Sequence, residues 1–251
     1  MKLVLQKTGS ARLLLALCGL LSASSATAQK SFAGTYLLWQ ETVSTTELPV
    51  LKDVVATTQA VAVVQISQHG ADLQIEGQLC SLHLSSTSSL VHTSFPPAFM
   101  KALPPIDLQG SIEERRGVPY LVTRAKTLVL GAQLARPQLD PLPKEASHPR
   151  VFDQDRDGHP GMTVHVSGLI NGEVYVVQRS STQLSGPATQ DGFRGGIHFE
   201  LEQNVVGASK QLLKNGPDPR PDSSRSQFAL VRWTTPLACD VAEVFARRWH
   251  R

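Results

Sequence analysis

The sequence lacks the short motifs that mark familiar catalytic and nucleotide-binding sites. It contains no GxSxG or SxxK nucleophile motif, no HExxH zinc motif, and no GxGxxG or P-loop glycine pattern. Its eight histidines are scattered along the chain and form no close cluster in the sequence. We therefore assign no catalytic residue from the sequence, and the balance favours a protein that is not an enzyme.

Long apolar runs are also missing. A membrane-spanning helix needs about 20 consecutive apolar residues, and no run in this sequence reaches that length. The strongest run, residues 13–21, follows three basic residues and precedes a stretch of small and polar residues that ends at Ala28. A basic start, a short apolar core and small residues before the cut make up a secretory signal peptide. We expect residues 1–28 to be removed and residues 29–251 to be secreted or periplasmic.

Two alternatives concern this first segment: a retained membrane anchor and a lipid on Cys18. The apolar run is short for an anchor, and Leu17 stands where a lipoprotein signal has a small residue. Three of the 24 basic residues and none of the 21 acidic residues precede the cut, so the mature chain carries equal numbers of both. A near-neutral chain gives no reason to expect a nucleic-acid partner, and we expect no transmembrane segment in the mature protein.

Cysteine is scarce, with only Cys80 and Cys239 left after the signal. An even number of cysteines in an oxidising compartment most simply forms a disulfide. Two separate buried thiols are the alternative. His83 follows Cys80 by three residues, but side chains with that spacing on a strand point to opposite faces, which weighs against a metal pair. The sequence therefore predicts a disulfide that encloses most of the domain.

Most of the mature chain has the alternation of β-strands. Residues 33–40, 54–67 and 73–84 are rich in β-branched and aromatic residues and predict three strands of a meander. In the third segment the leucines change phase after Gly77, which predicts a β-bulge there. Farther along, Asn171-Gly172 lies between two alternating segments, the strongest short-range signal for a hairpin. The hairpin register would place Leu169 opposite Val174.

A helix is expected at the carboxy terminus. Val241, Val244, Phe245 and Trp249 recur at helical spacing, which predicts that they share the buried face. A disulfide from Cys239 would attach this helix to the sheet. The elements together predict a single, mainly β domain: an antiparallel β-barrel or β-sandwich with long proline-rich loops and a carboxy-terminal α-helix.

The start of the mature chain bears on the choice between barrel and sandwich. Residues 32–36 (FAGTY) resemble the Gly-x-Trp opening strand of lipocalin-like barrels, with Tyr36 in the place of the tryptophan. A helix after the strands also fits that resemblance. The proline-rich segment at residues 136–149 departs from it. The resemblance therefore implies a β-barrel as an expectation of equal standing with a β-sandwich.

One motif carries recognisable chemistry. Asp153, Asp155 and Asp157 alternate in DQDRDG and are followed by Gly158, so the segment at residues 153–161 resembles the calcium loops of EF-hands, dockerins and thrombospondin type 3 repeats. Alternate carboxylates can converge on one hard cation, and glycine permits the sharp turn. The resemblance implies that the three aspartates are side-chain ligands. By the same match, His159 provides a backbone-carbonyl ligand.

Departures from the EF-hand pattern limit the resemblance. Val164 stands where an EF-hand has a bidentate glutamate, and Pro160 stands where the loop would donate a backbone N–H. The remaining ligands would come from Glu145, Glu173, Asp191 or water. Fewer charged ligands imply a dissociation constant of about 10⁻⁴–10⁻³ M. We expect a structural Ca²⁺ as cofactor, and a solvated acidic turn is the alternative.

The expected function is binding. Glu200 and Glu202 share one face of a strand, a spacing that could suit the paired carboxylates of glycoside hydrolysis. Phe199 and Leu201 on the other face favour an ordinary half-buried strand. We expect an exported, non-enzymatic binding or envelope-associated module whose partner is an unknown ligand or envelope component. A secreted hydrolase with carboxylate chemistry and a purely structural surface protein are the alternatives.

Overall fold

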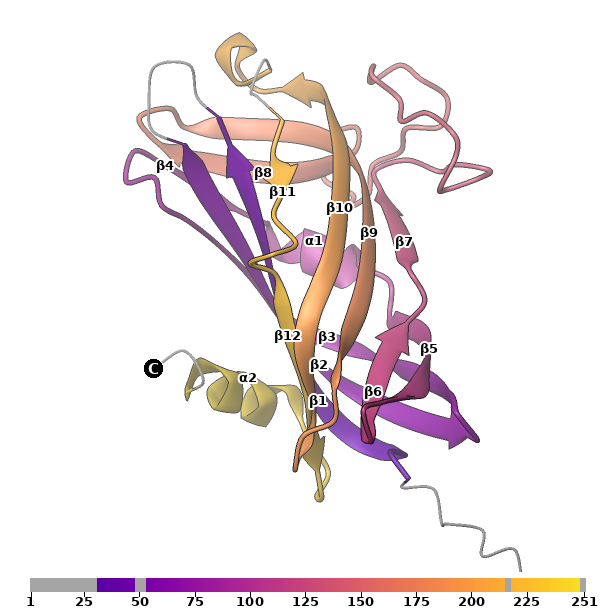
Figure 1. Ribbon diagram of the computed structural model, residues 1–251. Helices are drawn as coiled ribbons and strands as arrows, with labels where there is room; N and C mark the ends of the chain where they lie inside the picture. The colour runs from indigo at the N-terminus through magenta and orange to yellow at the C-terminus, as the bar shows by residue number, and fades with distance from the viewer. Residues whose placement is uncertain (1–30, 48–52, 215–217, 249–251) are drawn as a thin grey trace, which may run out of the picture. The chain divides into compact units, whose positions relative to one another are not determined.

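Antiparallel strands of the protein close into a ring (Figure 1). The computed structural model describes residues 31–47, 53–214 and 218–248, and the predicted signal peptide lies outside them. Eight strands pair with their neighbours in chain order, and the last pairs with the first, which makes an up-and-down barrel. The prediction of a mainly β, antiparallel fold is confirmed, with a barrel in place of a sandwich. The ring consists of β1 (Gly34–Thr46), β2 (Val54–His69), β3 (Asp72–Ser86), β5 (Ile106–Arg115), β6 (Val118–Thr123), β9 (Gly172–Pro187), β10 (Gly192–Ala208) and β12 (Gln227–Trp233).

Short elements extend the wall above β5, β6 and β12. The long strand β9 pairs with β6 near its end, with β7 in its middle and with β8 near its start. Strand β4 pairs with β8, and β11 pairs with the end of β1. In the described part of the chain no strand pairing joins β3 to β4. These elements are β4 (Val91–Ser94), β7 (Lys126–Leu130), β8 (Met162–Gly168), β11 (Arg220–Pro221), α1 (Pro97–Ala102) and the 3₁₀-helix η1 (Gln211–Leu213).

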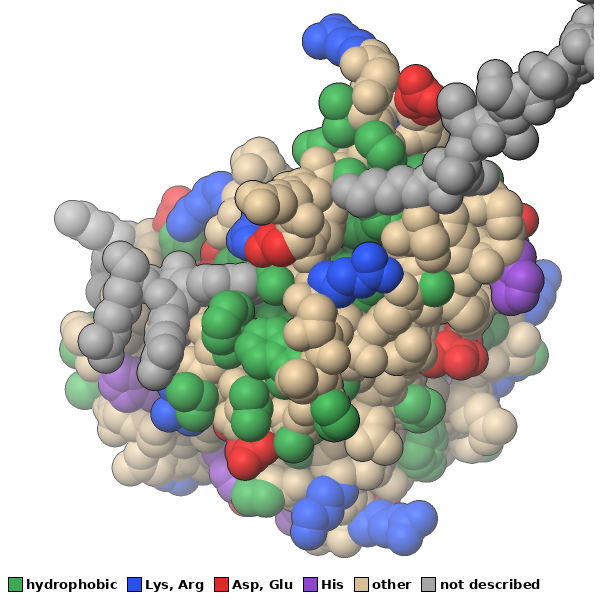
Figure 2. Space-filling view, turned by 90° about the horizontal axis from the view of Figure 1, so that it is seen from below, with side chains coloured by type: hydrophobic (Ala, Val, Ile, Leu, Met, Phe, Trp, Pro, Cys, Tyr) green, Lys and Arg blue, Asp and Glu red, His purple; other side chains and the backbone are tan. Residues whose placement is uncertain are grey.

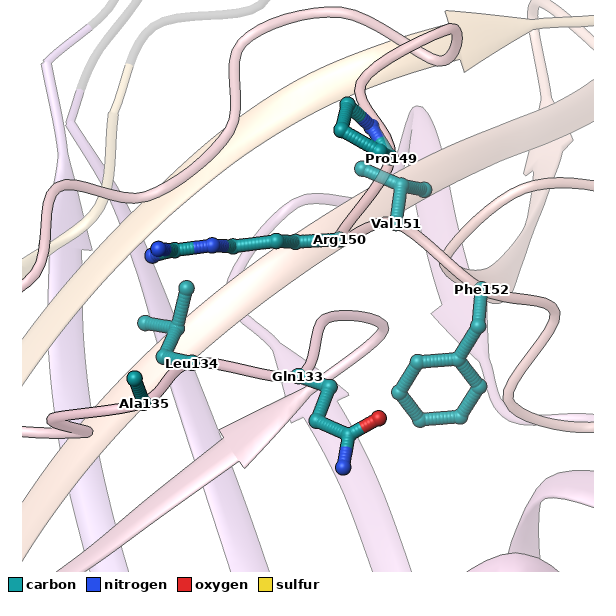
Figure 3. Close-up of a pocket in the computed structure, with 7 residues that line it drawn as sticks. All are labelled: Gln133, Leu134, Ala135, Pro149, Arg150, Val151 and Phe152. Atoms are coloured by element: carbon teal, nitrogen blue, oxygen red, sulfur yellow. The ribbon is translucent and has the colours of Figure 1, made fainter.

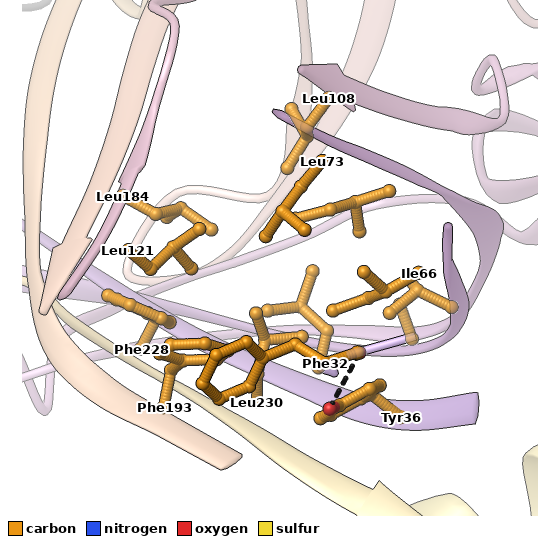
Figure 4. Packing of buried hydrophobic residues seen from close by; sticks show 14 of the residues in the cluster. Phe32, Tyr36, Ile66, Leu73, Leu108, Leu121, Leu184, Phe193, Phe228 and Leu230 are labelled. Atoms are coloured by element: carbon orange, nitrogen blue, oxygen red, sulfur yellow. Dashed lines mark hydrogen bonds between the residues drawn. The ribbon is translucent and has the colours of Figure 1, made fainter. Parts of the chain in front are cut away.

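One end of the barrel is filled by a solid core. Because side chains alternate along a strand, every second residue of the ring points inward. Phe193, Leu184 and Leu230 meet there from different strands and are almost fully buried. The Tyr36 hydroxyl donates a hydrogen bond of 2.9 Å to the carbonyl oxygen of Phe32, which draws the chain before β1 across the base (Figure 4). Burying a side chain of this size contributes about 1.5–3 kcal/mol, so this closed end anchors the fold.

The carboxy-terminal helix α2 (Cys239–Arg248) packs on the outside of the barrel. It covers the outward residues Leu37 and Trp39 of β1, which explains why consecutive residues of this strand are all buried. The helix presents Ala242 and Ala246 to the sheet, while Val241 is 45% exposed. The predicted buried face was therefore wrong for Val241 and Val244, although Phe245 packs partly against the sheet. Trp249 lies outside the described residues.

A disulfide fixes this helix to the barrel, as predicted. Cys80 and Cys239 are bonded, with their Cα atoms 5.1 Å apart. The register between β2 and β3 shifts at Cys80, which is the extra residue of a bulge, because Val61 pairs with Ser81 and Ala62 pairs with Leu79. The bulge therefore lies at Cys80 and not at Gly77. The extra residue lets the leucines on both sides of the bulge point inward while Cys80 points out to the helix.

The β8–β9 hairpin exists, but its predicted register was wrong. Val164 pairs with Val174 and Met162 pairs with Val176, whereas Leu169 belongs to the connecting turn and is 74% exposed. The predicted register would have set the polar Ser167 opposite the inward-facing Val176 and His165 opposite Gln178. A sheet with one buried face selects the register that pairs apolar with apolar side chains. The Asn171 carboxamide oxygen instead accepts the backbone N–H of Gly168 at 3.0 Å inside a longer turn.

The proline-rich segment after β7 is an ordered cover on the outer wall. Leu134 and Leu142 are buried against outward side chains of β9, including Tyr175. Asp140 organises the segment, since its carboxylate binds Arg136 and Arg150, each at 2.9 Å. Thus the segment expected to be only an extended loop contributes a small hydrophobic cluster of its own.

No helix among the described residues has the length and apolar character needed to cross a bilayer. Figure 2 views the molecule from the closed end of the barrel, where groups of hydrophobic side chains lie between polar and charged ones. Residues Ser31–Arg251 form one unit by their internal contacts.

Candidate binding lumen and metal loop

Above the closed end the barrel contains a cavity of about 630 Å³. The inward residues of β1 show the change along one strand: Tyr36 and Leu38 are buried in the core, whereas Gln40 and Thr42 are half-buried and line the cavity. The same change occurs along β10, where Ile197 is buried in the core and Leu201 is half-buried and lines the cavity. An eight-stranded barrel has room either for its own side chains or for one small ligand. This barrel does both, one above the other, and we call the open part the lumen.

Apolar side chains make up most of the lumen wall. Helix α1 lies against this wall, where the buried Phe99 packs with side chains of β7, β8 and β9. Pockets for small molecules are typically 300–1,000 Å³, mostly apolar, with a few polar groups. The apolar lining includes residues of β3, α1, β7, β8, β9 and β10: Leu82, Leu84, Phe99, Leu128, Val164, Val174 and Leu201.

Polar groups lie on a limited part of the lumen wall. Most of them are uncharged, and these belong mainly to β1 and the middle of β9: Gln40, Thr42, Ser44, Gln178, Ser180 and Thr182. The charged residues in the lining are Asp107 and Lys126, whose carboxylate and ammonium groups lie 3.1 Å apart. The hydrogen bond and charge of Lys126 lower the pKa of Asp107. The lumen therefore offers an apolar surface, neutral hydrogen-bonding groups and one ion pair.

The three aspartates of the DxDxD motif converge in the structure. One carboxylate oxygen from each of Asp153, Asp155 and Asp157 lies within 4.8 Å of the others, close enough to hold a metal ion. Arg156 and Gly158 both have positive φ, at 59° and 91°, and these two turns bring the alternate carboxylates to one side of the loop. The structure thus supports a local carboxylate loop, as the resemblance implied.

Hydrogen bonds inside the loop leave one carboxylate oxygen without a partner. Backbone N–H groups of the loop donate to Asp153, while Thr163 donates its N–H to Asp155 Oδ2 at 3.1 Å and its hydroxyl to Asp157 Oδ2 at 2.5 Å. Asp155 is 5% exposed, and its Oδ1 has no hydrogen-bond partner. Burial and the nearby carboxylates of Asp157 and Asp153 raise the pKa of Asp155. A buried carboxylate oxygen that faces two other carboxylates is the arrangement that a bound cation would satisfy.

The other residues considered for this site lie in different surroundings. The His159 ring stacks on Tyr175 with centroids 4.3 Å apart, and the role of its backbone carbonyl as a ligand stays a prediction. Glu173 accepts the Tyr175 hydroxyl at 3.2 Å, and Asp191 binds Thr189 and Arg194. Sequence reasoning missed Thr163, although its position near the end of the twelve-residue loop frame could have drawn attention to it.

Gln154 links the aspartate loop to the lumen wall. Its side-chain amide nitrogen donates to the carbonyl oxygen of Ala102 at 3.1 Å, and its oxygen accepts the backbone N–H of Gly131, also at 3.1 Å. Ala102 ends α1, and Gly131 directly follows β7, so one side chain joins two elements that line the lumen. The sequence does not indicate this role, because Gln154 stands between two aspartates that match metal ligands.

Two other candidate sites have less to support them. Glu200 and Glu202 point away from the lumen, and their carboxylates lie near His198 and Arg179 respectively. A surface pocket of about 340 Å³ lies in the proline-rich cover, where the Arg150 side chain runs above Leu134 (Figure 3). That arginine is bound to Asp140, so its charge is already engaged.

Comparisons of this chain with protein-family models, with curated proteins and with solved structures found no match.

Proposed function

We propose that this protein is an exported, non-enzymatic binding protein that holds one apolar molecule in the lumen of its barrel. The observation that carries the proposal is the cavity of about 630 Å³ above a solid core. Filling it with an apolar ligand would remove the half-buried leucines and valines of its wall from water, at about 25 cal/mol for each Å² of apolar surface.

The lining also indicates the chemistry of the ligand. Long apolar stretches of wall favour hydrocarbon, and the uncharged side chains of Gln40, Gln178 and Ser180 favour hydroxyl, amide or ester groups on it. The ligand class is therefore a mainly apolar molecule with a few neutral polar groups, such as a neutral lipid. Export through the predicted signal peptide would place this binding protein in the periplasm or outside the cell.

The test is to measure uptake of N-phenyl-1-naphthylamine, an uncharged dye whose fluorescence rises in apolar surroundings. Two neighbouring serines of β9 provide a matched pair: Ser180 lines the lumen, and Ser181 is the next residue, on the outward face. We expect saturable binding that Ser180→Trp weakens at least about tenfold by filling the cavity. Ser181→Trp should leave it unchanged. Equal affinities in both variants would contradict binding in the lumen.

We further propose that the aspartate loop binds a structural Ca²⁺. The support is the convergence of the three aspartates together with the partnerless Oδ1 of Asp155. Asp153, Asp155 and Asp157 would hold the ion, with the carbonyl of His159 and water completing an all-oxygen set. The ion would offset the repulsion among the carboxylates and stiffen the loop that leads into β8.

Thermal unfolding with calcium and with chelator tests the metal. At a dissociation constant of about 10⁻⁴–10⁻³ M, about 10 mM Ca²⁺ should stabilise the fold by about 1–3 kcal/mol. That gain corresponds to about 2–4 °C in midpoint for each kcal/mol. Asp155→Ala should abolish the shift, whereas substitution of the exposed Asp72, far from the loop in sequence, should keep it. A midpoint that ignores calcium in the unmodified protein would refute the site.

A further inference from the structure

Three exposed leucines stand at the open end of the barrel. Leu169 and Leu212 are 74% and 73% exposed, and Leu90 is 42% exposed. They belong to three separate segments: Leu90 directly precedes β4, Leu169 directly follows β8, and Leu212 lies in η1 after β10. Single exposed leucines are ordinary on protein surfaces, but a group of them marks an interaction site.

The three segments form one continuous rim. The backbone N–H of Leu169 donates to the carbonyl oxygen of Leu90 at 2.9 Å, which joins the first two segments. The third segment adjoins the same turn, because Ser209 accepts the backbone N–H of Glu173 at 2.8 Å. The Leu213 side chain lies so close to Gly172 that a Cβ on that glycine would come within 2.7 Å of it.

Apolar surface continues from this rim into the barrel. Leu213 follows the exposed Leu212 and itself lines the lumen. Val91 and Val174, at the starts of β4 and β9, line the lumen just below the other two leucines. A hydrocarbon chain that leaves the lumen at this end therefore meets leucine side chains, with Lys210 and Lys214 exposed on either side of Leu212.

We propose that the rim of Leu90, Leu169 and Leu212 docks on a lipid bilayer, so that an apolar ligand passes between membrane and lumen without crossing water. Leucines on separate loop tips can each enter the interfacial region of a bilayer, and nearby lysines attract anionic headgroups. The lumen that opens beside these segments favours a bilayer over a protein partner, which needs a well-packed patch. This inference rests on the proposed function of the lumen.

Flotation with phospholipid vesicles, neutral or about one-third anionic, tests the docking. We expect the full mature protein to float with vesicles and the double variant Leu169→Ser/Leu212→Ser to bind on the order of 100-fold more weakly, about tenfold for each leucine. The matched control is Leu139→Ser, which changes a leucine that is 72% exposed on the proline-rich cover and should have no effect.

The lysines supply a second comparison. Lys210→Glu/Lys214→Glu should reduce binding to anionic vesicles by about tenfold or more and leave binding to neutral vesicles nearly unchanged. Lys144→Glu, on the proline-rich cover, is the control for charge. An equal loss of flotation in Lys144→Glu would overturn the assignment of the rim as the docking surface.

Other outcomes separate the alternatives. The docking proposal is overturned if the unmodified protein stays with neither vesicle type, or if Leu139→Ser weakens binding as much as the rim variant does. It is also overturned if ultracentrifugation shows a dimer that the rim substitutions dissociate while flotation is unaffected. Dye uptake without vesicles is measured on the same proteins. An unmodified protein that floats with vesicles but takes up no dye would remove the lumen function alone. An unmodified protein that takes up dye but does not float would remove docking alone.

Discussion

Cys80, the extra residue of the bulge in β3, is bonded to Cys239 in the first turn of α2, across a sequence separation of 159 residues. The bond connects a strand of the barrel to the helix that covers β1, β2 and β12 from outside. Because both cysteines face away from the lumen, the bond fixes α2 to the barrel without touching the cavity.

Removal of the disulfide should destabilise the protein and release α2. For a loop of this length the chain-entropy model gives about 5 kcal/mol as an upper value. In the Cys80→Ala/Cys239→Ala protein we expect a lower denaturation midpoint and a red shift of tryptophan emission, because Trp39 lies under the helix and Trp233 packs edge-on against Phe245 at 5.0 Å. An unchanged midpoint together with two titratable thiols in the native, oxidised protein would contradict the bond.

Asp140 should make the proline-rich cover sensitive to acid. The backbone N–H of Arg136, the side chain of Arg136 and the charge of Arg150 lower the pKa of Asp140 in the folded protein. A lowered folded pKa means that the carboxylate contributes stability above its unfolded pKa of about 3.9 and loses it as the pH falls through the folded value. The stability difference between the unmodified protein and Asp140→Asn should therefore be full at neutral pH and shrink below about pH 4.

Denaturant titrations of both proteins at pH 7 and at about pH 3 measure this difference. The substitution Asp53→Asn, at an exposed residue near β2, is the control and should show no comparable pH dependence. A difference between unmodified protein and Asp140→Asn that stays constant over this pH range would show that the carboxylate does not hold the cover.

The two parts of the barrel interior should respond differently to truncation. Leu184 of β9 is 1% exposed in the closed-end core, while Leu201 of β10 is half-buried on the lumen wall. Leu184→Ala leaves a void in a packed core and should cost about 2–5 kcal/mol. Leu201→Ala only enlarges an existing cavity, so its effect on the free energy of unfolding should be smaller by at least about 1 kcal/mol. Equal losses would mean that the lumen is packed in solution.

Asp155→Asn should reverse its effect with calcium. Without metal, the buried Asp155 carboxylate faces those of Asp153 and Asp157, and an amide would remove the repulsion and donate a hydrogen bond to one of them. The variant should therefore unfold at a higher temperature than the unmodified protein in chelator. With about 10 mM Ca²⁺ the order should invert, because the amide weakens the ion site. A variant that is less stable under both conditions would refute this account.

The class of the fold and the disulfide could be predicted from local patterns. Alternating β-branched and aromatic residues indicate the strands, and two cysteines in a chain with a predicted export signal indicate the bond. The register of β8 on β9 could not, because Asn171-Gly172 satisfies local turn rules whereas the inward valines Val164 and Val174 decide the pairing in three dimensions. The leucine pattern favours a bulge at Gly77, because the position of the extra residue at Cys80 depends on a helix that lies 159 residues away.

The lumen was the least visible feature in the sequence. Inward positions of β1 read as Tyr36, Leu38, Gln40 and Thr42, so the same face of one strand passes from core to cavity. In a sequence, half-buried polar residues at alternate positions look like a solvent-facing side. Helical spacing also made the exposed Val244 look like a core residue of α2. The disulfide, and not the apolar spacing, sets which face of this helix meets the sheet.

The missing strand pairing between β3 and β4 leaves one part of the barrel wall without a hydrogen-bond ladder, within the part of the chain that the structure describes. Around the closed end each strand of the ring is hydrogen-bonded to both neighbouring strands, which fixes the diameter of the barrel there. Nearer the open end, within the described residues, β3 and β4 lie side by side without a strand pairing. The Ser86 hydroxyl donates a hydrogen bond of 3.4 Å to the carbonyl oxygen of Val91 between them. On the proposed function, a wide ligand would separate these two strands without breaking a hydrogen-bond ladder, so the lumen would accept ligands of different width while the closed end stays unchanged.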